Sequence, residues 1–386
     1  MLHIKNAKIY TMAGDVIEKG DILADGGKII QVAESIEAPG AEVIDAEGLC
    51  ALPGFVDAHS HIGGLDTATG NMELNEVTDP VIPNMQAIYG VDVSDANFKS
   101  ALAAGITTAC ICPGSLNVIS GQAFAAKTYG KDIHEMVLKD PCALKLALGG
   151  NPKRSWAARF MAPMTRMAVA HLIRSTFRAA QDYLAAKEAA GDDKAKQPPF
   201  DPKSEAILPA LRGEIPLKFH CEQFDIVTAI EIAKEFGCNY SIDHAWDACD
   251  YYDELESGGG TVMFGPIGIP VGLGEARGAD IFCVKELVER GLNVTLITDA
   301  PAYACDILLI QAGEAVRWGT PHEDALRMLT INGAKALGLA DRIGSIEAGK
   351  DADITLFKGV PAIDVGAQLQ CTIVNGEIAW KRGGLS

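Results

Sequence analysis

The chain has 386 residues, of which 48% are hydrophobic and 22% are charged, and its formal net charge is -18 at pH 7. This length suffices for a large enzyme domain and a smaller one, and the composition is that of a folded protein rather than a disordered or fibrous one. An acidic surface repels nucleic acid and anionic lipid, and no basic run would recruit a polyanion. We therefore expect neither nucleic acid nor a membrane as a partner.

Ten cysteines are scattered along the chain without a Cys-x-x-Cys pair. A chain with a core of this size does not need a disulfide framework, so the pattern predicts reduced, mostly buried thiols and a cytoplasmic location. The opening residues 1–6 lack the basic region and the apolar core of a signal peptide. No uninterrupted apolar stretch approaches the roughly 18 residues that a membrane-spanning helix requires.

Both ends of the sequence have residue patterns that are typical of short strands and turns. Residues 2–50 contain several strand-like runs separated by glycine turns. Near the other end, residues 353–357 and 371–380 alternate apolar and polar side chains, and Asn375-Gly376 is typical of a tight hairpin. Two β-rich ends around a different middle predict one small all-β domain built from both termini. Its predicted segments are residues 1–51 and 345–386.

The middle of the chain, residues 52–344, alternates strand-like and helix-like segments. Repeated strand–helix units imply parallel strands, and about eight of them indicate a closed barrel rather than an open sheet. A helical insertion is expected at about 152–215, with one long helix over residues 164–190. We therefore predict an α/β fold whose largest part is a barrel.

Polar residues with metal-binding chemistry stand where the apolar runs stop. The strand-like run Leu49–Val56 leads into His59 and His61, and side chains two residues apart on a strand share a face, so both can reach one cation. Taken singly, each residue is explained by capping, turn chemistry or a hydrogen bond in the core. Their recurrence at later strand ends predicts a metal site at the carboxyl ends of the strands. The later strand-end residues are His220, His244 and Asp299.

These motifs resemble a known family. They are Gly54-Phe55-Val56-Asp57-Ala58-His59-Ser60-His61, the strand-end residues His220 and His244, Thr298-Asp299, and the tail segments 330–339 and 344–353. Together they are similar to the amidohydrolase superfamily of metal-dependent hydrolases, in its imidazolonepropionase-like and prolidase-like branch. The similarity covers essentially the whole chain apart from parts of the insertion. It implies a (β/α)₈ TIM-like barrel with a small composite β-sandwich domain made from the two termini.

The resemblance also implies a role for each strand-end residue. His59 and His61 match the paired ligands of the first strand, and His220 and His244 match the ligands of the fifth and sixth strands. Asp299 matches the last-strand Asp, which binds metal and takes the proton from the attacking water. The implied cofactor is a divalent metal, zinc before others, with one or two ions per chain.

Lys145 decides between one and two metals. It lies on an apolar strand with Ala143 and Ala147 two residues to either side, where a bare ammonium is costly. Prolidase-like enzymes carry a carboxylated lysine bridging two metals at the corresponding place. The segment that follows, Gly149–Lys153, departs from those enzymes by one residue in spacing, and some relatives have Glu where this chain has Gly150. The sequence leaves both alternatives open.

The run His220-Cys221-Glu222-Gln223 resembles the His-Ala-Glu-Gln of imidazolonepropionases. In those enzymes the site holds one metal, which would make Glu222 catalytic and His244 a water-polarising base. The structural alternative is that Glu222 begins the next helix, where the dipole favours an acidic residue. The segment 299–303 lacks the substrate signature of a true imidazolonepropionase.

Four further side chains are candidates for substrate binding. Lys153, Arg154 and Trp156 follow the fourth strand and could hold a carboxylate and an apolar group, and Tyr303 follows the last strand. Solvated loop positions are the alternative for each of them.

The leading hypothesis is a metal-dependent amidohydrolase that cleaves a C–N amide bond of a small cyclic or peptidic substrate, with Asp299 as general base. The alternative is an aminohydrolase that releases ammonia from a nitrogen heterocycle, although Gln223 stands where many deaminases carry Glu. A noncatalytic assembly protein is a third possibility, which the complete set of ligands disfavours. The resemblance is also compatible with a homo-oligomer.

Overall fold

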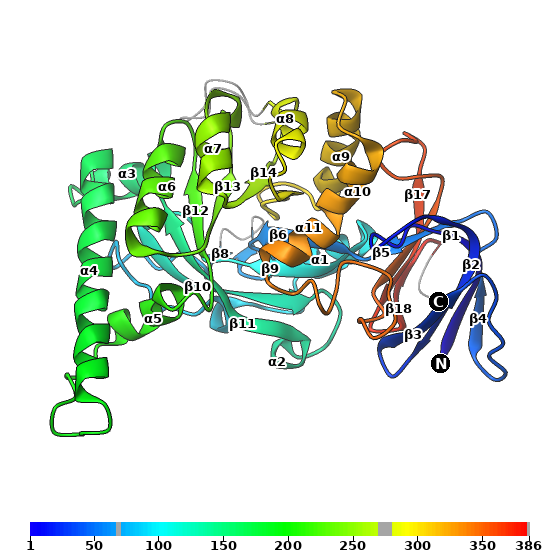
Figure 1. Ribbon diagram of the computed structural model, residues 1–386, viewed down its shortest axis with the longest axis horizontal. Helices are drawn as coiled ribbons and strands as arrows, with labels where there is room; N and C mark the ends of the chain where they lie inside the picture. The colour runs from blue at the N-terminus through cyan, green and yellow to red at the C-terminus, as the bar shows by residue number, and fades with distance from the viewer. Residues whose placement is uncertain (67–70, 269–279, 384–386) are drawn as a thin grey trace.

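The computed structural model describes residues 1–66, 71–268 and 280–383, and Figure 1 shows their arrangement. The described strands form two eight-stranded sheets and a small ribbon of β7 (Leu65–Asp66) and β8 (Asn71–Met72). One large sheet is built from the middle of the chain, and the other joins strands from its two ends. The fold is therefore mixed α/β, as the sequence predicted.

The sheet in the middle of the chain curls into a nearly closed barrel. Its strand order is β15-β14-β13-β12-β11-β10-β9-β6. The strands are β6 (Phe55–Ser60), β9 (Ile106–Ile111), β10 (Ile119–Lys127), β11 (Val137–Ala147), β12 (Leu217–Cys221), β13 (Tyr240–His244), β14 (Thr261–Phe264) and β15 (Val294–Leu296). Most of their residues are buried, because strands covered by helices on one side and closed on the other have no solvated face.

One strand corrects the expectation that all barrel strands are parallel. β10 pairs antiparallel with both β9 and β11, whereas β11 to β15 and the pair β6–β9 are parallel. The links on either side of β10, residues 112–118 and 128–136, are too short for the crossover that a parallel neighbour requires. The sequence analysis missed β10, because Ser120-Gly121-Gln122-Ala123 gives a weak strand signal.

Polar contacts close the barrel between its first and last strands. Asp57 Oδ1 accepts a hydrogen bond from the backbone N–H of Thr298 at 3.2 Å, and Asp57 Oδ2 accepts one from the Thr298 hydroxyl. Next to them, the backbone N–H of Asp299 donates to the carbonyl of His59 at 3.2 Å. Burial raises the pKa of the Asp57 carboxyl to about 6. The closure places the residue before Asp299 beside the strand that carries His59 and His61.

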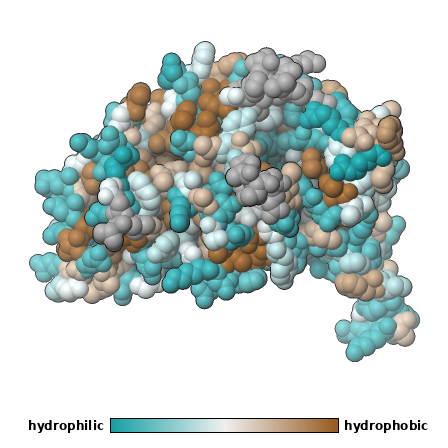
Figure 2. All heavy atoms as spheres, turned by 180° about the vertical axis from the view of Figure 1, so that it is seen from behind, coloured by the Kyte–Doolittle hydropathy of each residue, from teal (hydrophilic) through white to brown (hydrophobic). Residues whose placement is uncertain are grey.

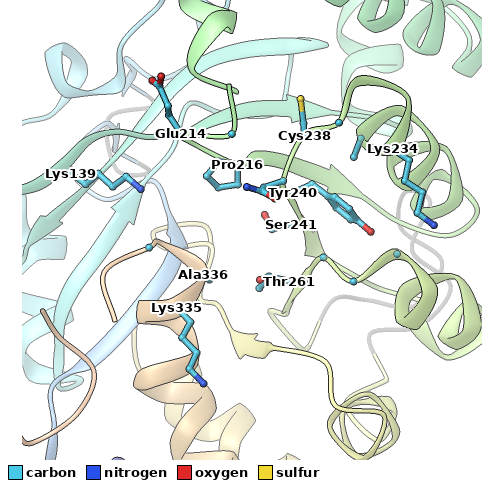
Figure 3. Close-up of a pocket in the computed structure, with 18 residues that line it drawn as sticks. Lys139, Glu214, Pro216, Lys234, Cys238, Tyr240, Ser241, Thr261, Lys335 and Ala336 are labelled. Atoms are coloured by element: carbon cyan, nitrogen blue, oxygen red, sulfur yellow. The ribbon is translucent and has the colours of Figure 1, made fainter. Parts of the chain in front are cut away.

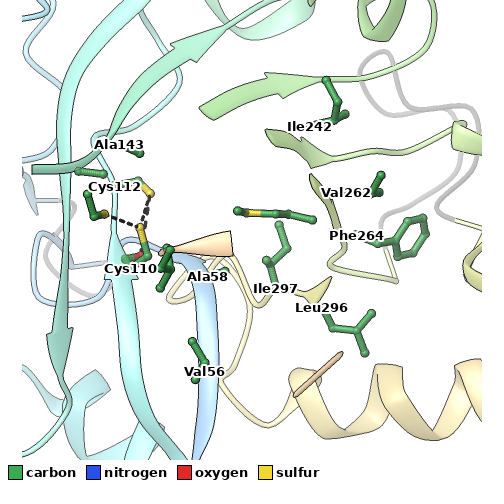
Figure 4. Close-up of a cluster of buried hydrophobic side chains, with 14 of the residues drawn as sticks. Val56, Ala58, Cys110, Cys112, Ala143, Ile242, Val262, Phe264, Leu296 and Ile297 are labelled. Carbon is green, nitrogen blue, oxygen red and sulfur yellow. Dashed lines mark hydrogen bonds between the residues drawn. The ribbon is translucent and has the colours of Figure 1, made fainter. Parts of the chain in front are cut away.

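A cluster of buried apolar side chains packs around the barrel strands. Figure 4 shows Val56, Val262, Phe264 and Leu296 from neighbouring strands in this cluster, and all four are buried. It also shows a group of thiols, in which Cys110 Sγ lies 3.6 Å from Cys112 Sγ and 3.5 Å from Cys142 Sγ. All ten cysteines are free and all but Cys249 are buried, as the sequence predicted.

Helices cover the outside of the barrel (Figure 1). They are α1 (Ala96–Ala103), α2 (Ile133–Met136), α3 (Gly150–Ala157), α4 (Arg166–Ala190), α5 (Pro202–Leu211), α6 (Asp225–Phe236), α7 (Tyr252–Gly258), α8 (Cys283–Glu289), α9 (Ile307–Arg317), α10 (His322–Leu329) and α11 (Ile331–Ala336), with short 3₁₀ turns η1 (Ala87–Gly90) and η2 (Ala248–Asp250). None of the helices in the described part of the chain combines the length and the apolarity needed to cross a lipid bilayer.

The long helix expected in the insertion is α4. It begins after Thr165, whose side chain accepts a hydrogen bond from the backbone N–H of Ala168 and so caps the helix. Its buried face packs beside α6, where the rings of Phe177 and Phe236 lie 5.1 Å apart. Figure 2 shows that the protruding end of α4 and the loop after it carry mostly hydrophilic side chains. The insertion therefore extends the flank of the barrel.

Strands from both ends of the chain share the second large sheet, in the order β18-β17-β16-β5-β1-β2-β3, with β4 paired to β1. They are β1 (Leu2–Ile9), β2 (Ile17–Asp25), β3 (Lys28–Ala33), β4 (Glu42–Asp45), β5 (Cys50–Pro53), β16 (Ile354–Lys358), β17 (Gln368–Val374) and β18 (Glu377–Lys381). The two termini thus meet in one sheet. The sandwich arrangement and the domain limits remain predictions.

A buried cation joins this sheet to the barrel. Lys127, at the end of β10, forms an ion pair with Asp351 at 2.9 Å and a second one with Asp353. The backbone N–H of Gly54 donates to the carbonyl of Asp353 at 2.9 Å, and a Cβ at Gly54 would lie 2.1 Å from Thr107 Oγ1. Only glycine therefore fits where β5 passes into β6.

Candidate metal centre

Three side chains at the ends of β6 and β15 bring potential ligand atoms together. Asp299 Oδ1 lies 3.3 Å from His61 Nε2 and 3.6 Å from His59 Nε2. Among the described residues, these three form the group whose ligand atoms all lie within 4.8 Å of one another. Both histidines are buried, and the Asp299 side chain is 19% exposed. The spacing fits one cation at about 2.0–2.2 Å from each atom.

Hydrogen bonds behind the two histidines orient their rings. His59 Nδ1 donates to Asp243 Oδ2 at 2.7 Å, and His61 Nδ1 donates to the carbonyl of Cys112 at 2.8 Å. Because both partners can only accept, each ring carries a proton on Nδ1, and in the neutral ring Nε2 presents its lone pair to the space between the three side chains. Metal-binding imidazoles are held in this way.

His244 and His220 continue the cluster from the ends of β13 and β12. The ring centroids of His59 and His244 lie 4.9 Å apart, and those of His220 and His244 lie 4.3 Å apart. His244 Nδ1 donates to the carbonyl of Gly265 at 2.9 Å, which leaves Nε2 as an acceptor. The structure therefore places all four predicted histidines and Asp299 at one end of the barrel, and their role as ligands stays a prediction.

His220 has a neighbour that the sequence analysis did not single out. Asn151 Nδ2 lies 3.1 Å from His220 Nε2, and Asn151 Oδ1 accepts a hydrogen bond from Arg154 Nη2 at 2.7 Å. His220 Nδ1 is buried and makes no hydrogen bond to a described residue. The only sequence signal for Asn151 is that it lies in the segment whose spacing departs from the prolidase-like pattern.

Two buried lysines lie beside the histidines. Lys218 Nζ lies 3.0 Å from Asp243 Oδ2, whereas Lys145 Nζ lies 3.8 Å from that oxygen and 3.5 Å from His59 Nε2. Burial lowers the pKa of Lys145. For Lys218, burial also lowers the pKa, but the charge of Asp243 outweighs it and the pKa is raised. Sequence reasoning found Lys145 and missed Lys218 and Asp243.

The charge states of the cluster suit a cation. Burial lowers the pKa of His220 to about 3 and holds that of His244 well below its usual value. Burial would raise the pKa of Asp299, but hydrogen bonding to His59 and His61 outweighs it and holds the pKa well below its usual range. Contact with Asp299 likewise outweighs burial at His61 and raises its pKa. An ionised carboxylate and neutral imidazoles bind a metal, so a cation at this site would compete with the proton that the raised pKa favours on His61.

The backbone at two of these residues lies in a region that side-chain-bearing residues seldom adopt. His244 has φ 72° and Asp299 has φ 57°. Such conformations are costly and persist where the surrounding packing enforces them, which is common at functional sites. Both occur where a strand has just ended, and the turn of the chain at these points was not visible in the sequence.

Glu222 belongs to the turn between β12 and α6. It is buried, and its Oε1 lies 3.6 Å from His220 Nε2. Because α6 begins at Asp225, Glu222 precedes the helix. Glu222 therefore lies beside His220 and ahead of the helix, and its role at the site stays a prediction.

The four predicted substrate contacts differ in exposure. Trp156 is fully buried and its indole N–H donates to Asn117 Oδ1 at 3.2 Å, which favours packing. Arg154 is exposed, and Lys153 and Tyr303 are partly exposed. Burial and the charge of Asp299 raise the pKa of Tyr303.

A cavity of about 570 Å³ lies at the opposite end of the barrel, where β12, β13 and β14 begin. Figure 3 shows Ser241 and Thr261 at its centre, Lys139 reaching toward it, and Lys234 and Lys335 directed outward. None of the predicted site residues lines this cavity.

Comparisons with known proteins identify relatives of the whole chain. The model of the amidohydrolase family matches residues 228–379. The crystal structure of an amidohydrolase from Thermotoga maritima is 37% identical, with a TM-score of 0.94 over 99% of this chain and 100% of that one. The imidazolonepropionase of Porphyromonas gingivalis is 24% identical over 91% of this chain and 85% of that protein. The amidohydrolase tasK of Hapsidospora irregularis is 29% identical over 90% of this chain, which spans only 38% of that protein.

Proposed function

Because this chain belongs to the amidohydrolase superfamily, in its imidazolonepropionase-like branch, we propose that it is a metal-dependent enzyme that hydrolyses a C–N bond of a small cyclic or peptidic substrate. The superfamily assignment makes the chain a hydrolase. The substrate class, the metal and the residue roles are the proposal. Similarity over nine tenths of the chain to enzymes named for an imidazolone supports a cyclic substrate before a peptidic one.

The observation that carries the proposal is the group of His59, His61 and Asp299. Two oriented imidazoles and one carboxylate, with Oδ1 of Asp299 3.3 Å and 3.6 Å from the two Nε2 atoms, are a ligand set that fits a catalytic divalent ion. When bound, such an ion supplies an activated water and polarises the scissile carbonyl. The two histidines hold the site, and their buried rings keep bulk water from the ligand atoms.

Asp299 has the second task of moving a proton. Its Oδ1 is engaged with the two histidines, so Oδ2 is the atom available to accept the proton of the attacking water and return it to the leaving nitrogen. Its side chain is 19% exposed, which allows substrate and water to approach.

Three neighbours support this chemistry. His244 Nε2 is an acceptor that can orient the attacking water, because Nδ1 is committed to the carbonyl of Gly265. Glu222, beside His220, is placed to contact the substrate or to handle a proton. Arg154, held by Asn151, offers an exposed guanidinium to a substrate carboxylate.

Zinc is the proposed metal, since imidazole and carboxylate ligands in a buried, open-sided group suit it. Lys145 sets the number of ions. An unmodified ammonium 3.5 Å from His59 Nε2 would repel a second cation, whereas a carboxylated Nζ would supply an anionic bridge toward His220 and His244.

The test is a joint measurement of metal content and hydrolysis. Purified protein is analysed for metals and assayed against cyclic amides, imides, N-acyl amino acids and dipeptides, with ammonia release recorded separately. We expect bound zinc, and ring opening or amide cleavage without ammonia. Ammonia from a heterocycle would establish the aminohydrolase alternative, and a wild-type protein that binds no divalent metal would overturn the proposal. The variant Lys145→Ala shows whether the zinc content falls from two ions to one.

A further inference from the structure

We propose that the buried pair of Lys218 and Asp243 fixes the orientation of His59 and the nitrogen that carries its proton, and so acts as the positioning device of the metal centre. This inference rests on the proposed function, because it assumes that His59 binds the metal through Nε2. Neither residue touches the space between the three ligand atoms, and both act through His59.

Asp243 has one orientation because both of its oxygens are engaged. Oδ2 accepts from His59 Nδ1 at 2.7 Å and from Lys218 Nζ at 3.0 Å, and Oδ1 accepts from the hydroxyl of Ser241 at 2.6 Å. The side chains of His59, Lys218 and Asp243 are completely buried. The two donors on Oδ2 keep this oxygen at the imidazole, and the Ser241 hydroxyl adds a contact to the other oxygen.

Lys218 is fixed independently of Asp243. Its Nζ also donates to the carbonyl of Ala58 at 3.0 Å and lies 2.9 Å from Met263 Sδ. Ala58 immediately precedes His59, so one ammonium from β12 holds both the backbone of β6 and the carboxylate from β13. This arrangement couples the strand that carries the ligand to the acceptor that orients it.

The two buried lysines have separate tasks. Lys218 lies 3.0 Å from Asp243 Oδ2, while Lys145 lies 3.8 Å from it and closer to His59 Nε2. Because Lys218 neutralises Asp243, Lys145 is left next to the ligand nitrogen. Without Lys218, Lys145 and His59 would share the carboxylate of Asp243. Lys145 would then be drawn toward Asp243 and away from His59 Nε2.

The consequence for His59 is chemical. An ionised carboxylate can only accept, so it selects the form of the imidazole with the proton on Nδ1 and the lone pair on Nε2. Without that acceptor the proton can move to Nε2, where it would block the metal. An ion pair with only a structural role would not control the proton of His59. Such pairs can often be replaced by apolar groups at little cost in stability.

The first experiment uses the double variant Lys218→Met with Asp243→Leu, which removes both charges of the pair together. Zinc affinity is measured by competition with a chromogenic chelator. We expect a loss of about tenfold to a hundredfold, the usual effect of removing an outer partner of a metal-binding histidine. Asp243→Asn serves as a second variant in case the double variant does not fold. Its amide can offer either an oxygen or an N–H to His59, and we expect its zinc affinity to fall about tenfold.

Ser241→Ala is the matched control, because it removes the hydrogen bond to the other oxygen of the same carboxylate. Its zinc affinity should stay within about threefold of wild type, since His59 keeps its acceptor. Loss of affinity in this control equal to that in Asp243→Asn would overturn the proposal, because general disturbance of the core would then explain both.

The second measurement does not need the metal. Nitrogen-15 NMR of histidine-labelled, metal-free protein, assigned with His59→Gln, reports which nitrogen of His59 carries the proton. We expect Nδ1–H in wild type and loss of that state in both Asp243 variants. Unchanged zinc affinity and an unchanged His59 signal in those variants would overturn the positioning role. Wild-type protein that binds no zinc but shows His59 Nδ1–H would overturn the proposed function and support the positioning of His59.

Discussion

The two ends of the barrel strands bury different kinds of side chain. At the carboxyl ends, His59, His244 and Asp299 are packed against one another with their polar atoms a few ångströms apart. At the amino ends, a cavity of about 570 Å³ is bordered by glycine turns and by lysines such as Lys234 and Lys335, which are exposed. The cavity therefore does not lie at the end where the predicted site residues gather.

The difference shows how a cavity compares with a cluster of buried polar side chains as a sign of a functional site. The amino end has room, but its charges are solvated and its strand starts are already hydrogen-bonded to one another, as in the 2.8 Å bond from Leu217 N–H to the carbonyl of Asn239. The carboxyl end holds groups that are costly to bury unless they act on something. Strained backbone at His244 and Asp299 is found at the same end.

The largest contrast between the two ends should be seen in activity. Asp299→Asn keeps the shape of the side chain but removes the base, so we expect kcat to fall about 10³-fold. Lys335→Ala at the amino-end cavity should leave kcat within about twofold, since it alters only a solvated charge. Steady-state kinetics on the best substrate of the panel measures both, and similar losses in the two variants would break the comparison.

Metal binding should stabilise only through the carboxyl end. A zinc concentration about 1,000 times the dissociation constant adds about 4 kcal/mol to the free energy of unfolding. We expect thermal unfolding of chelator-treated protein to shift upward by several degrees on adding zinc. His61→Ala should abolish the shift and Lys234→Ala should retain it. A shift that survives in His61→Ala would place the metal elsewhere.

Acid should weaken the metal-free protein through its buried histidines. The pKa of His220 falls from a usual value of about 6.5 to about 3 in the folded chain. Below pH 6.5 His220 becomes protonated in the unfolded chain but stays neutral in the folded one. Its contribution to the free energy of unfolding is therefore fully present above pH 6.5. It is lost as the pH falls toward 3, by about 1.4 kcal/mol per pH unit.

Denaturant unfolding at several pH values, compared between wild type and His220→Gln, isolates this contribution. The variant should lose less stability between pH 6.5 and 4.5 than wild type. Parallel curves for the two proteins would show that His220 is not held neutral by its burial.

The smallest effect is expected at the amino end. The Tyr240 hydroxyl is buried and makes no hydrogen bond to a described residue. Tyr240→Phe should therefore leave kcat unchanged and alter the free energy of unfolding by no more than about 1 kcal/mol, in the stabilising direction. Chemical denaturation measures it, and a loss above that range would reveal a contact that the hydroxyl makes.

The sequence predicted the elements whose signals are local. The apolar run that ends in His59 and His61, the strand ends at His220 and His244, and the amphipathic helix α4 are each legible within a few residues. β10 was missed because its small and polar residues are fixed by their neighbours rather than by their own propensity.

Long-range partners account for the rest of what was missed. His59 and Asp243 are 184 positions apart, and Lys218 reaches Ala58 across 160 positions. Nothing in a short window relates such residues. A buried lysine on an apolar strand has the same sequence pattern whether it holds a carboxylate, as Lys218 does, or lies beside a proposed metal ligand, as Lys145 does. The two lysines can be distinguished only by their contacts in the closed barrel.

The contact that closes the barrel also determines when, during synthesis, the proposed metal site can form. Asp57 and Thr298 are 241 positions apart, so the first strand emerges from the ribosome long before its final partner exists. Until then, Asp57 has no hydroxyl to accept and His59 and His61 have no Asp299. Pairings of this separation form slowly because a long loop must be closed. A cation held by His59, His61 and Asp299, as proposed, would bind only after the last barrel strand has been inserted, so its uptake would report completed folding.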